Sequence, residues 1–282
     1  MVRAGGLGAG GPVANGAASR VLAFPTMATS TLPPSAPPTL EQRCALRQRP
    51  ATQPVGHQRW NHLLFAHWPV DPAAVQATLP RGLAVDTFGG TAYLGIVPFA
   101  MERVRPAGLP PLPGVSWFLE LNLRTYVHDG QGNAGVWFYS LDCNRALAVT
   151  LARRFFHLPY FHACIAARRK GDRMHFDCRR RDGASAGGTY VWTPGAETRT
   201  VIPESLEFFL VERYLLYAAD AAGRLYSGRV HHEPYRVAPA AATELSVEPA
   251  RQAGFTIAGA PVSVLSAQPV DVAIFPLQAQ GR

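Results

Sequence analysis

Several features are scarce in this sequence of 282 residues, and each shortage excludes a class of protein. No run of 18 or more apolar residues occurs, so no membrane-spanning helix is predicted. The four cysteines, Cys44, Cys143, Cys164 and Cys178, form no C-x-x-C pair, which argues against a zinc site and a small disulfide scaffold. Dinucleotide, P-loop and serine-hydrolase fingerprints are also missing, so no cofactor is predicted.

The cysteine usage and the N-terminus both bear on the cellular compartment. Unpaired thiols are typical of a reducing cytoplasm. The Gly- and Ala-rich N-terminus lacks the continuous apolar segment of a signal peptide. We therefore predict a cytoplasmic protein.

Histidines offer no metal site in the sequence. His57, His62 and His67 repeat every five residues, a spacing that puts them on no common helix face and on alternate strand faces. His162 and Cys164 would share one strand face, but two further ligands are missing nearby in the sequence. No metal site is predicted.

The net charge of +8 is concentrated in two segments. Residues 1–55 carry a net charge of +4 and residues 168–181 a net charge of +5, which leaves the rest of the chain close to neutral. A broad nucleic-acid footprint is therefore not predicted. The basic hairpin 168–181 is either a solvated arm whose arginines protect a sheet edge, which we favour, or a patch that binds polyanions.

The composition changes near residue 56. Residues 1–55 are rich in Gly and Pro and are predicted to be a disordered tail. Residues 56–282 are predicted to form one domain, since they are long enough to bury a sizeable core and contain no repeat.

Most of this domain has the alternation and β-branched content of strands. We expect about eight to ten strands, and two or three short helices near residues 71–80, 145–156 and 203–210. Leu147, Leu151 and Phe155 recur at helical spacing in the second of these. The predicted fold is mainly β (α+β), an antiparallel β-barrel or curled double sheet.

Many short blocks of the sequence together resemble one protein family. Among them are Leu94-Gly95-Ile96-Val97-Pro98-Phe99, Glu120-Leu121-Asn122-Leu123-Arg124-Thr125-Tyr126-Val127 and Gly135-Val136-Trp137-Phe138-Tyr139-Ser140-Leu141-Asp142. In this order, they resemble the YqjF-like family of uncharacterised bacterial proteins over roughly residues 59–277. The resemblance implies a fold related to acetoacetate decarboxylase, and it implies no settled activity.

The one lysine decides whether the decarboxylase chemistry is expected. Acetoacetate decarboxylases use a lysine that forms a Schiff base, and a second cation lowers the pKa of that lysine. This sequence has only Lys170, at the predicted tip of the basic hairpin, where a solvated amine stays protonated. Arginine cannot form an imine, so Schiff-base decarboxylation is not expected.

The remaining site hypothesis rests on alternation in residues 116–128. Glu120, Asn122 and Arg124 fall on one face of this strand, opposite three leucines. The polar face either meets water or lines the barrel lumen beside Asp142 and Arg145. In the lumen, an arginine held by a glutamate would present a planar fork to a carboxylate.

Two other polar clusters leave alternatives open. Tyr214 belongs to Glu212-Arg213-Tyr214, which is either a pocket cluster or a structural ion pair. At His231-His232, at most one imidazole can point inward, because successive strand residues face opposite ways. We include Tyr214 and His231 in the candidate site.

The sequence thus predicts a protein that binds a small acidic or amphipathic molecule in a barrel pocket. The alternative is a non-catalytic module that binds polyanions through the basic hairpin. Enzyme status stays open at this point, and a homo-oligomer is possible.

Overall fold

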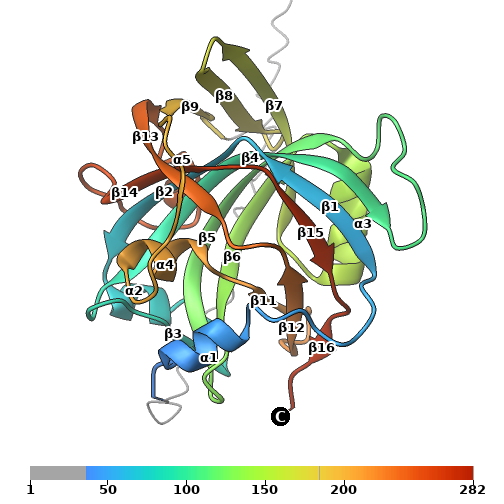
Figure 1. The fold of residues 1–282 in the computed structure, drawn as a ribbon, viewed down its shortest axis with the longest axis vertical. Helices are drawn as coiled ribbons and strands as arrows, with labels where there is room; N and C mark the ends of the chain where they lie inside the picture. Colours follow the sequence, from blue (N-terminus) through green and yellow to red (C-terminus); the bar gives the residue numbers. More distant parts are fainter. Residues whose placement is uncertain (1–35, 184, 282) are drawn as a thin grey trace, which may run out of the picture.

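The computed structural model describes residues 36–183 and 185–281, and these residues fold around one large curled sheet (Figure 1). The mainly β prediction is confirmed, although the described residues contain more strands than the eight to ten expected. The strands are β1 (Gly56–Asn61), β2 (Leu63–Val70), β3 (Leu83–Val85), β4 (Ala92–Pro106), β5 (Phe118–Asp129), β6 (Ala134–Cys143), β7 (Tyr160–Lys170), β8 (Arg173–Arg180), β9 (Gly188–Pro194), β10 (Arg199–Thr200), β11 (Leu215–Ala219), β12 (Leu225–His231), β13 (Arg236–Leu245), β14 (Ser263–Ala267), β15 (Val270–Ile274) and β16 (Gln278–Ala279).

The strand pairings close two circuits that share a wall. One circuit runs β1-β15-β12-β11-β6-β5-β4 and returns to β1. The other runs from β6 through β7, β8, β9, β13, β14 and β2 to β4, and β5 completes it. Pairing is antiparallel except between β11 and β6 and between β6 and β7. Strands β4, β5 and β6 therefore have an interior on each face.

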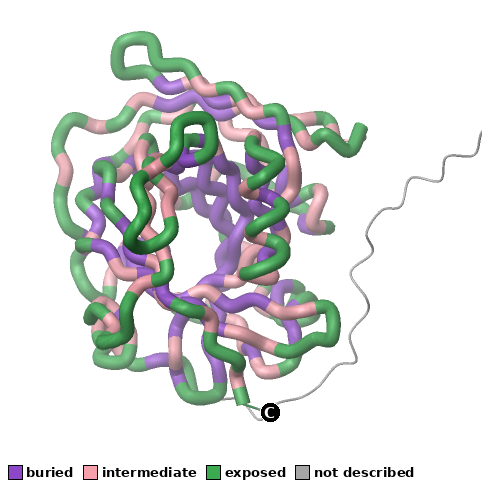
Figure 2. The backbone as a smooth tube through the Cα atoms, turned by 90° about the vertical axis from the view of Figure 1, so that its right-hand side faces the viewer, coloured by how far each residue is buried: buried purple, intermediate pink, exposed green. Residues whose placement is uncertain are grey.

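Each face of the shared wall packs into its own hydrophobic core. The first core contains Phe65, Val97 and Tyr126, and the second core contains Leu94, Leu123 and further apolar residues from β8 and β9. Nearly every residue of β5 is buried, so both of its faces are covered by protein. In Figure 2 the buried stretches of the backbone, in purple, gather in the interior of the molecule, and the exposed stretches, in green, lie mostly around them.

Five short helices in the described residues decorate the sheet, and their starts follow local sequence signals. Asp71 accepts a hydrogen bond from the backbone N–H of Ala73, and Pro72 occupies the first turn, as the sequence predicted. Ser205 caps another helix in the same way. The helices are α1 (Leu40–Ala45), α2 (Pro72–Gln76), α3 (Ala146–Phe156), α4 (Leu206–Val211) and α5 (Glu248–Gln252). None of them is long and apolar enough to cross a membrane.

Residues 36–55 differ from the disordered tail that the sequence predicted up to residue 55. Thr39 and Gln42 form a capping box at the start of α1. Arg43 then binds Asp86 through two hydrogen bonds of 2.7 Å, and Arg47 binds Glu212. These long-range ion pairs order a segment whose own composition has little to bury. The predicted tail over residues 1–35 lies outside the described residues.

Candidate functional site

The polar face of β5 lies in the first core, on the same side of the shared wall as Val97 and Tyr126. Glu120, Asn122 and Arg124 are buried, with exposures of 1%, 5% and 8%. Arg124 is the register partner of Gly95 on β4, and Gly95 is the register partner of His67 on β2. The register thus places Arg124 and His67 in the same row of the first core.

Arg124 is a buried cation without an acidic partner in the described part of the chain. Its Nη2 donates to the carbonyl oxygen of Leu210 at 2.9 Å, near the C-terminus of α4. Its guanidinium lies over the rings of Phe65 and Tyr126, 5.2 and 5.6 Å from their centroids. Its Nε has no hydrogen-bond partner. Glu120 therefore does not hold Arg124, and this part of the hypothesis is wrong.

His67 and Tyr126 form a neutral hydrogen-bonded pair beside this arginine. The hydroxyl of Tyr126 donates to the carbonyl of Leu210 at 2.8 Å and lies 2.8 Å from Nε2 of His67. Because the hydroxyl has only one proton, we assign the shared proton to Nε2, which leaves Nδ1 unprotonated and without a partner. Burial, together with Arg124, holds the pKa of His67 well below its ordinary value.

Glu120 lies four residues before Arg124 on β5 and binds a different tyrosine. Tyr160 donates its hydroxyl proton to Oε2 of Glu120 at 2.8 Å. Burial raises the pKa of Glu120 to about 8, against the opposing effect of the Tyr160 hydrogen bond. The carboxyl is therefore mostly protonated at neutral pH, and Arg124 carries the net charge of this polar row.

Asp142 does not join the row, and a bulge in β6 is the reason. Tyr139 has no partner on β5, where the register shifts between Leu123 and Arg124. Val136 therefore faces the first core, while Asp142, with the same parity, faces the second. A bulge reverses the alternation beyond it, and it leaves no clear mark in the sequence.

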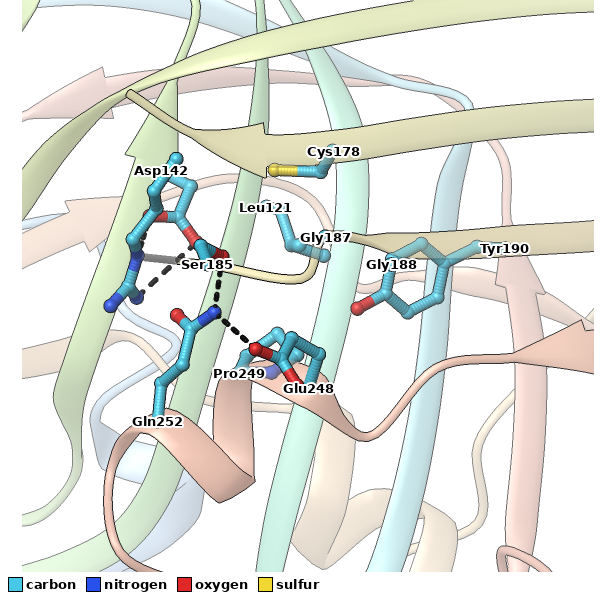
Figure 3. Close-up of a pocket in the computed structure, with 11 residues that line it drawn as sticks. Leu121, Asp142, Cys178, Ser185, Gly187, Gly188, Tyr190, Glu248, Pro249 and Gln252 are labelled. Carbon is cyan, nitrogen blue, oxygen red and sulfur yellow. Dashed lines mark hydrogen bonds and ion pairs between the residues drawn. The ribbon is translucent and has the colours of Figure 1, made fainter. Parts of the chain in front are cut away.

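Asp142 instead lines a small cavity whose other lining residues include members of β8, β9 and α5 (Figure 3). Its carboxylate accepts hydrogen bonds from Arg180 at 2.5 and 3.3 Å. The cavity measures about 10 Å³, which is room for about one water molecule. Arg145 lies outside both cores and is exposed, with its Nε 3.4 Å from the carbonyl oxygen of Trp117. Neither residue can meet a ligand held by Arg124.

Tyr214 and His231 are also placed apart from Arg124. Tyr214 donates its hydroxyl proton to Glu212 and stacks on His232. His231 is only half-buried, whereas His232 is 2% exposed and contacts the rings of Trp60, Tyr214 and Tyr235. The inward histidine is therefore His232 and not His231.

The basic hairpin projects from the sheet as the strands β7 and β8. Lys170 is exposed at its tip, so it is not part of either core. Arg168 pairs with Asp177, Arg169 with Asp172, and Arg180 with Asp142. Asp172 and Asp177 are already counted in the net charge of +5, so only the pair with Asp142 lowers the charge of this candidate polyanion site further.

Sequence reasoning missed two residues beside Arg124, one on another strand and one on the same strand. His67 was assessed as a metal ligand, and Tyr126 was not singled out, although it continues the alternation of Glu120, Asn122 and Arg124 by one step. That alternation was the signal for Tyr126. Nothing local marks His67, because only the strand register brings it to Arg124. The described residues contain no cluster of three or more metal-binding side chains.

Comparison with known structures shows the fold. An acetoacetate decarboxylase-like enzyme from Sphingomonas wittichii RW1 matches with a TM-score of 0.58 and 13% identity, over 83% of this chain and 96% of the other. The enduracididine biosynthesis enzyme MppR, solved with pyruvate, matches with a TM-score of 0.56 and 13% identity, over 82% and 93% of the two chains. At this identity, the likeness concerns the fold alone, and it confirms the acetoacetate decarboxylase-like prediction.

Sequence comparison identifies the family. The uncharacterized protein YqjF of Bacillus subtilis is 38% identical over 222 residues, which cover 78% of this chain and 90% of YqjF. The family model DUF2071, described as an uncharacterized conserved protein, matches residues 57–271. The resemblance to YqjF-like proteins is confirmed, and the chain belongs to the DUF2071 family.

Proposed function

We propose that the protein binds a small molecule with a carboxylate group in the first core, with Arg124 as the anchor. The observation that carries this proposal is the buried guanidinium without an acidic partner among the described residues. An uncompensated buried cation is costly, because it loses hydration without gaining a counter-charge. A carboxylate ligand supplies that charge and two acceptor oxygens for the guanidinium.

The surroundings of Arg124 favour a ligand that is more than a simple anion. Oδ1 of Asn122 and Nδ1 of His67 are buried acceptors without partners. A hydroxyl or amino group on the ligand can donate to such an acceptor while the carboxylate meets Arg124. MppR, which shares the fold, was solved with pyruvate, a small carboxylate whose keto group accepts hydrogen bonds but donates none. The proposed ligand class is therefore small polar carboxylic acids.

Schiff-base decarboxylation is not part of the proposed function. The only lysine of the chain is exposed on the β7–β8 hairpin, and the cation in the polar row of the first core is Arg124. A guanidinium forms no imine at neutral pH. Glu120, protonated at neutral pH, is available instead as a proton donor to a bound ligand. A turnover assay therefore belongs with any ligand that is found.

A thermal-shift screen against small carboxylic acids, starting with pyruvate, tests the proposal. At 100 times its Kd, a ligand stabilises the folded protein by about 2.7 kcal/mol. We expect Arg124→Leu to lose the shift and Arg145→Leu, the matched exposed arginine, to keep it. An equal shift in Arg124→Leu would remove Arg124 from the site. If no acid shifts wild type while heparin does, the polyanion-binding alternative replaces this proposal.

A further inference from the structure

Exposed apolar side chains gather on one side of the molecule. Of the ten large apolar residues that the described part of the chain exposes, seven lie in the loop between β4 and β5 or on α3. The loop residues are 40–59% exposed, and they are Leu109, Leu112, Val115 and Trp117. Monomeric proteins seldom expose a continuous apolar patch without using it.

The outer face of α3 continues this patch. Leu147, Leu151 and Phe155 are 53%, 44% and 60% exposed. Their spacing of four residues places them within an arc of about 80° on the helix. The opposite face packs inward through Val149 and Phe156. The helix is therefore apolar on both sides, and its outer stripe has no partner in the described chain.

The loop and the helix belong to one surface. Nε of Arg145, the residue before α3, lies 3.4 Å from the carbonyl oxygen of Trp117, and Asn144 donates its backbone N–H to Leu119. Figure 1 shows the loop beside α3 at the right-hand edge, and that edge faces the reader in Figure 2, where its backbone is largely marked as exposed. We call residues 103–117 and 144–156 the apolar patch.

The charges on the apolar patch indicate which class of partner it binds. The two segments contain five arginines and no acidic residue. A second copy of the same surface would oppose these charges with equal ones, and an acidic headgroup layer would complement them. Exposed leucine, phenylalanine and tryptophan with flanking arginines are typical of helices that lie in a membrane interface.

We propose that the apolar patch docks the protein on an anionic lipid surface. The side chains of Trp117, Leu151 and Phe155 enter the headgroup region, and Arg145 and Arg154 meet the lipid phosphates. The docking is peripheral and does not depend on the ligand proposed for Arg124, which lies inside the first core.

The test is co-sedimentation of the full chain with vesicles of phosphatidylcholine and phosphatidylglycerol in equal parts, and with phosphatidylcholine alone. We expect binding to the anionic vesicles that weakens as salt is raised. The triple variant Leu147→Gln/Leu151→Gln/Phe155→Gln should bind about tenfold more weakly or worse. These positions are solvent-exposed, so the variant should fold, which circular dichroism checks.

The matched control changes exposed apolar residues outside the apolar patch. Ile202→Gln/Val262→Gln removes two such side chains, which are 68% and 53% exposed, and should bind like wild type. Wild type that fails to bind anionic vesicles at low salt would overturn the proposal, as would equal loss in the control. A dimer in light scattering that the triple variant converts to monomer would assign the patch to a second copy instead.

Discussion

Two buried arginines lie over the ring of Tyr126, and they differ in what neutralises them. Arg213 lies 4.9 Å from the ring centroid and donates to Asp86 at 2.7 Å. Arg124 lies 5.6 Å from the same centroid, and a backbone carbonyl is its hydrogen-bond acceptor. Both guanidinium groups also bind carbonyls of α4, at Phe209 and Leu210.

The comparison separates a structural charge from one that is available to a ligand. Asp86 is fully buried, and it holds both Arg213 and Arg43, so its charge and that of Arg213 are balanced within the fold. Each guanidinium has one buried nitrogen without a hydrogen-bond partner, Nε in Arg124 and Nη2 in Arg213, so the difference between the two arginines is the counter-charge. Burial and residue type are therefore not enough to identify a binding arginine, and the missing counter-charge is the informative feature.

The largest effect on stability should come from breaking the ion pair between Asp86 and Arg213. We expect Asp86→Ala to lower the free energy of unfolding by about 3–5 kcal/mol, because Arg213 would remain buried and unpaired. Urea denaturation measures the change. The exposed pair of Asp271 and Arg59 gives the control, since Asp271→Ala should cost about 1 kcal/mol or less. Equal effects in the two variants would contradict the structural role of Asp86.

The pH dependence of the Asp86 contribution has a defined sign. Burial alone would raise the pKa of Asp86, but Arg213 and Arg43 hold it below its ordinary value. The stabilisation by this carboxylate is therefore present above the ordinary pKa of about 4 and is lost as the pH falls through the lower folded value.

Glu120 should give the next largest effect, with the opposite sign. Its pKa rises from 4.5 to about 8 in the folded protein, so the folded state keeps a proton that the unfolded state releases. The free energy of unfolding should fall by roughly 3 kcal/mol or more between about pH 4.5 and pH 8.

Glu120→Gln should flatten this part of the pH profile, because glutamine does not ionise. Denaturation at pH 5 and pH 8 measures it, with the exposed Glu244→Gln as the control. A Gln variant with an unchanged profile would count against burial of an uncharged Glu120.

A smaller effect is expected at Gly95, which lies between Arg124 and His67 in register. A Cβ at Gly95 would lie 3.1 Å from Cδ2 of His67 and 3.3 Å from the hydroxyl oxygen of Tyr126. Gly95→Ala should therefore cost about 1–3 kcal/mol by overpacking. Gly130→Ala, where nothing lies within 4 Å, should not. Adding His67→Ala should recover part of the loss in a double-mutant cycle.

Arg124→Leu should change the free energy of unfolding least, by about 1 kcal/mol or less in either direction. The variant loses two ring contacts and one hydrogen bond, but it also removes an uncompensated buried charge. Denaturation without ligand measures this. A loss as large as that of Asp86→Ala would mean that Arg124 is structural too, and the contrast between the two arginines would fail.

Local signals in the sequence predicted much of the fold. Asp71 and Pro72 begin a helix where their chemistry favours one, and the alternation within residues 116–128 corresponds to the strand Phe118–Asp129. The alternation also brought Glu120, Asn122 and Arg124 to one face. The start of α1 shows a limit, because its capping box lay within a segment whose composition predicts disorder.

By itself, the sequence determined which residues share a face, because a period of two or 3.6 residues is a property of the local backbone. Only the tertiary structure decided what covers each face. It enclosed the polar face of β5 inside the first circuit of strands, turned Asp142 away through a bulge at Tyr139, and left the stripe of Leu147, Leu151 and Phe155 in solvent. These outcomes depend on strand register and long-range pairing, which no local pattern specifies.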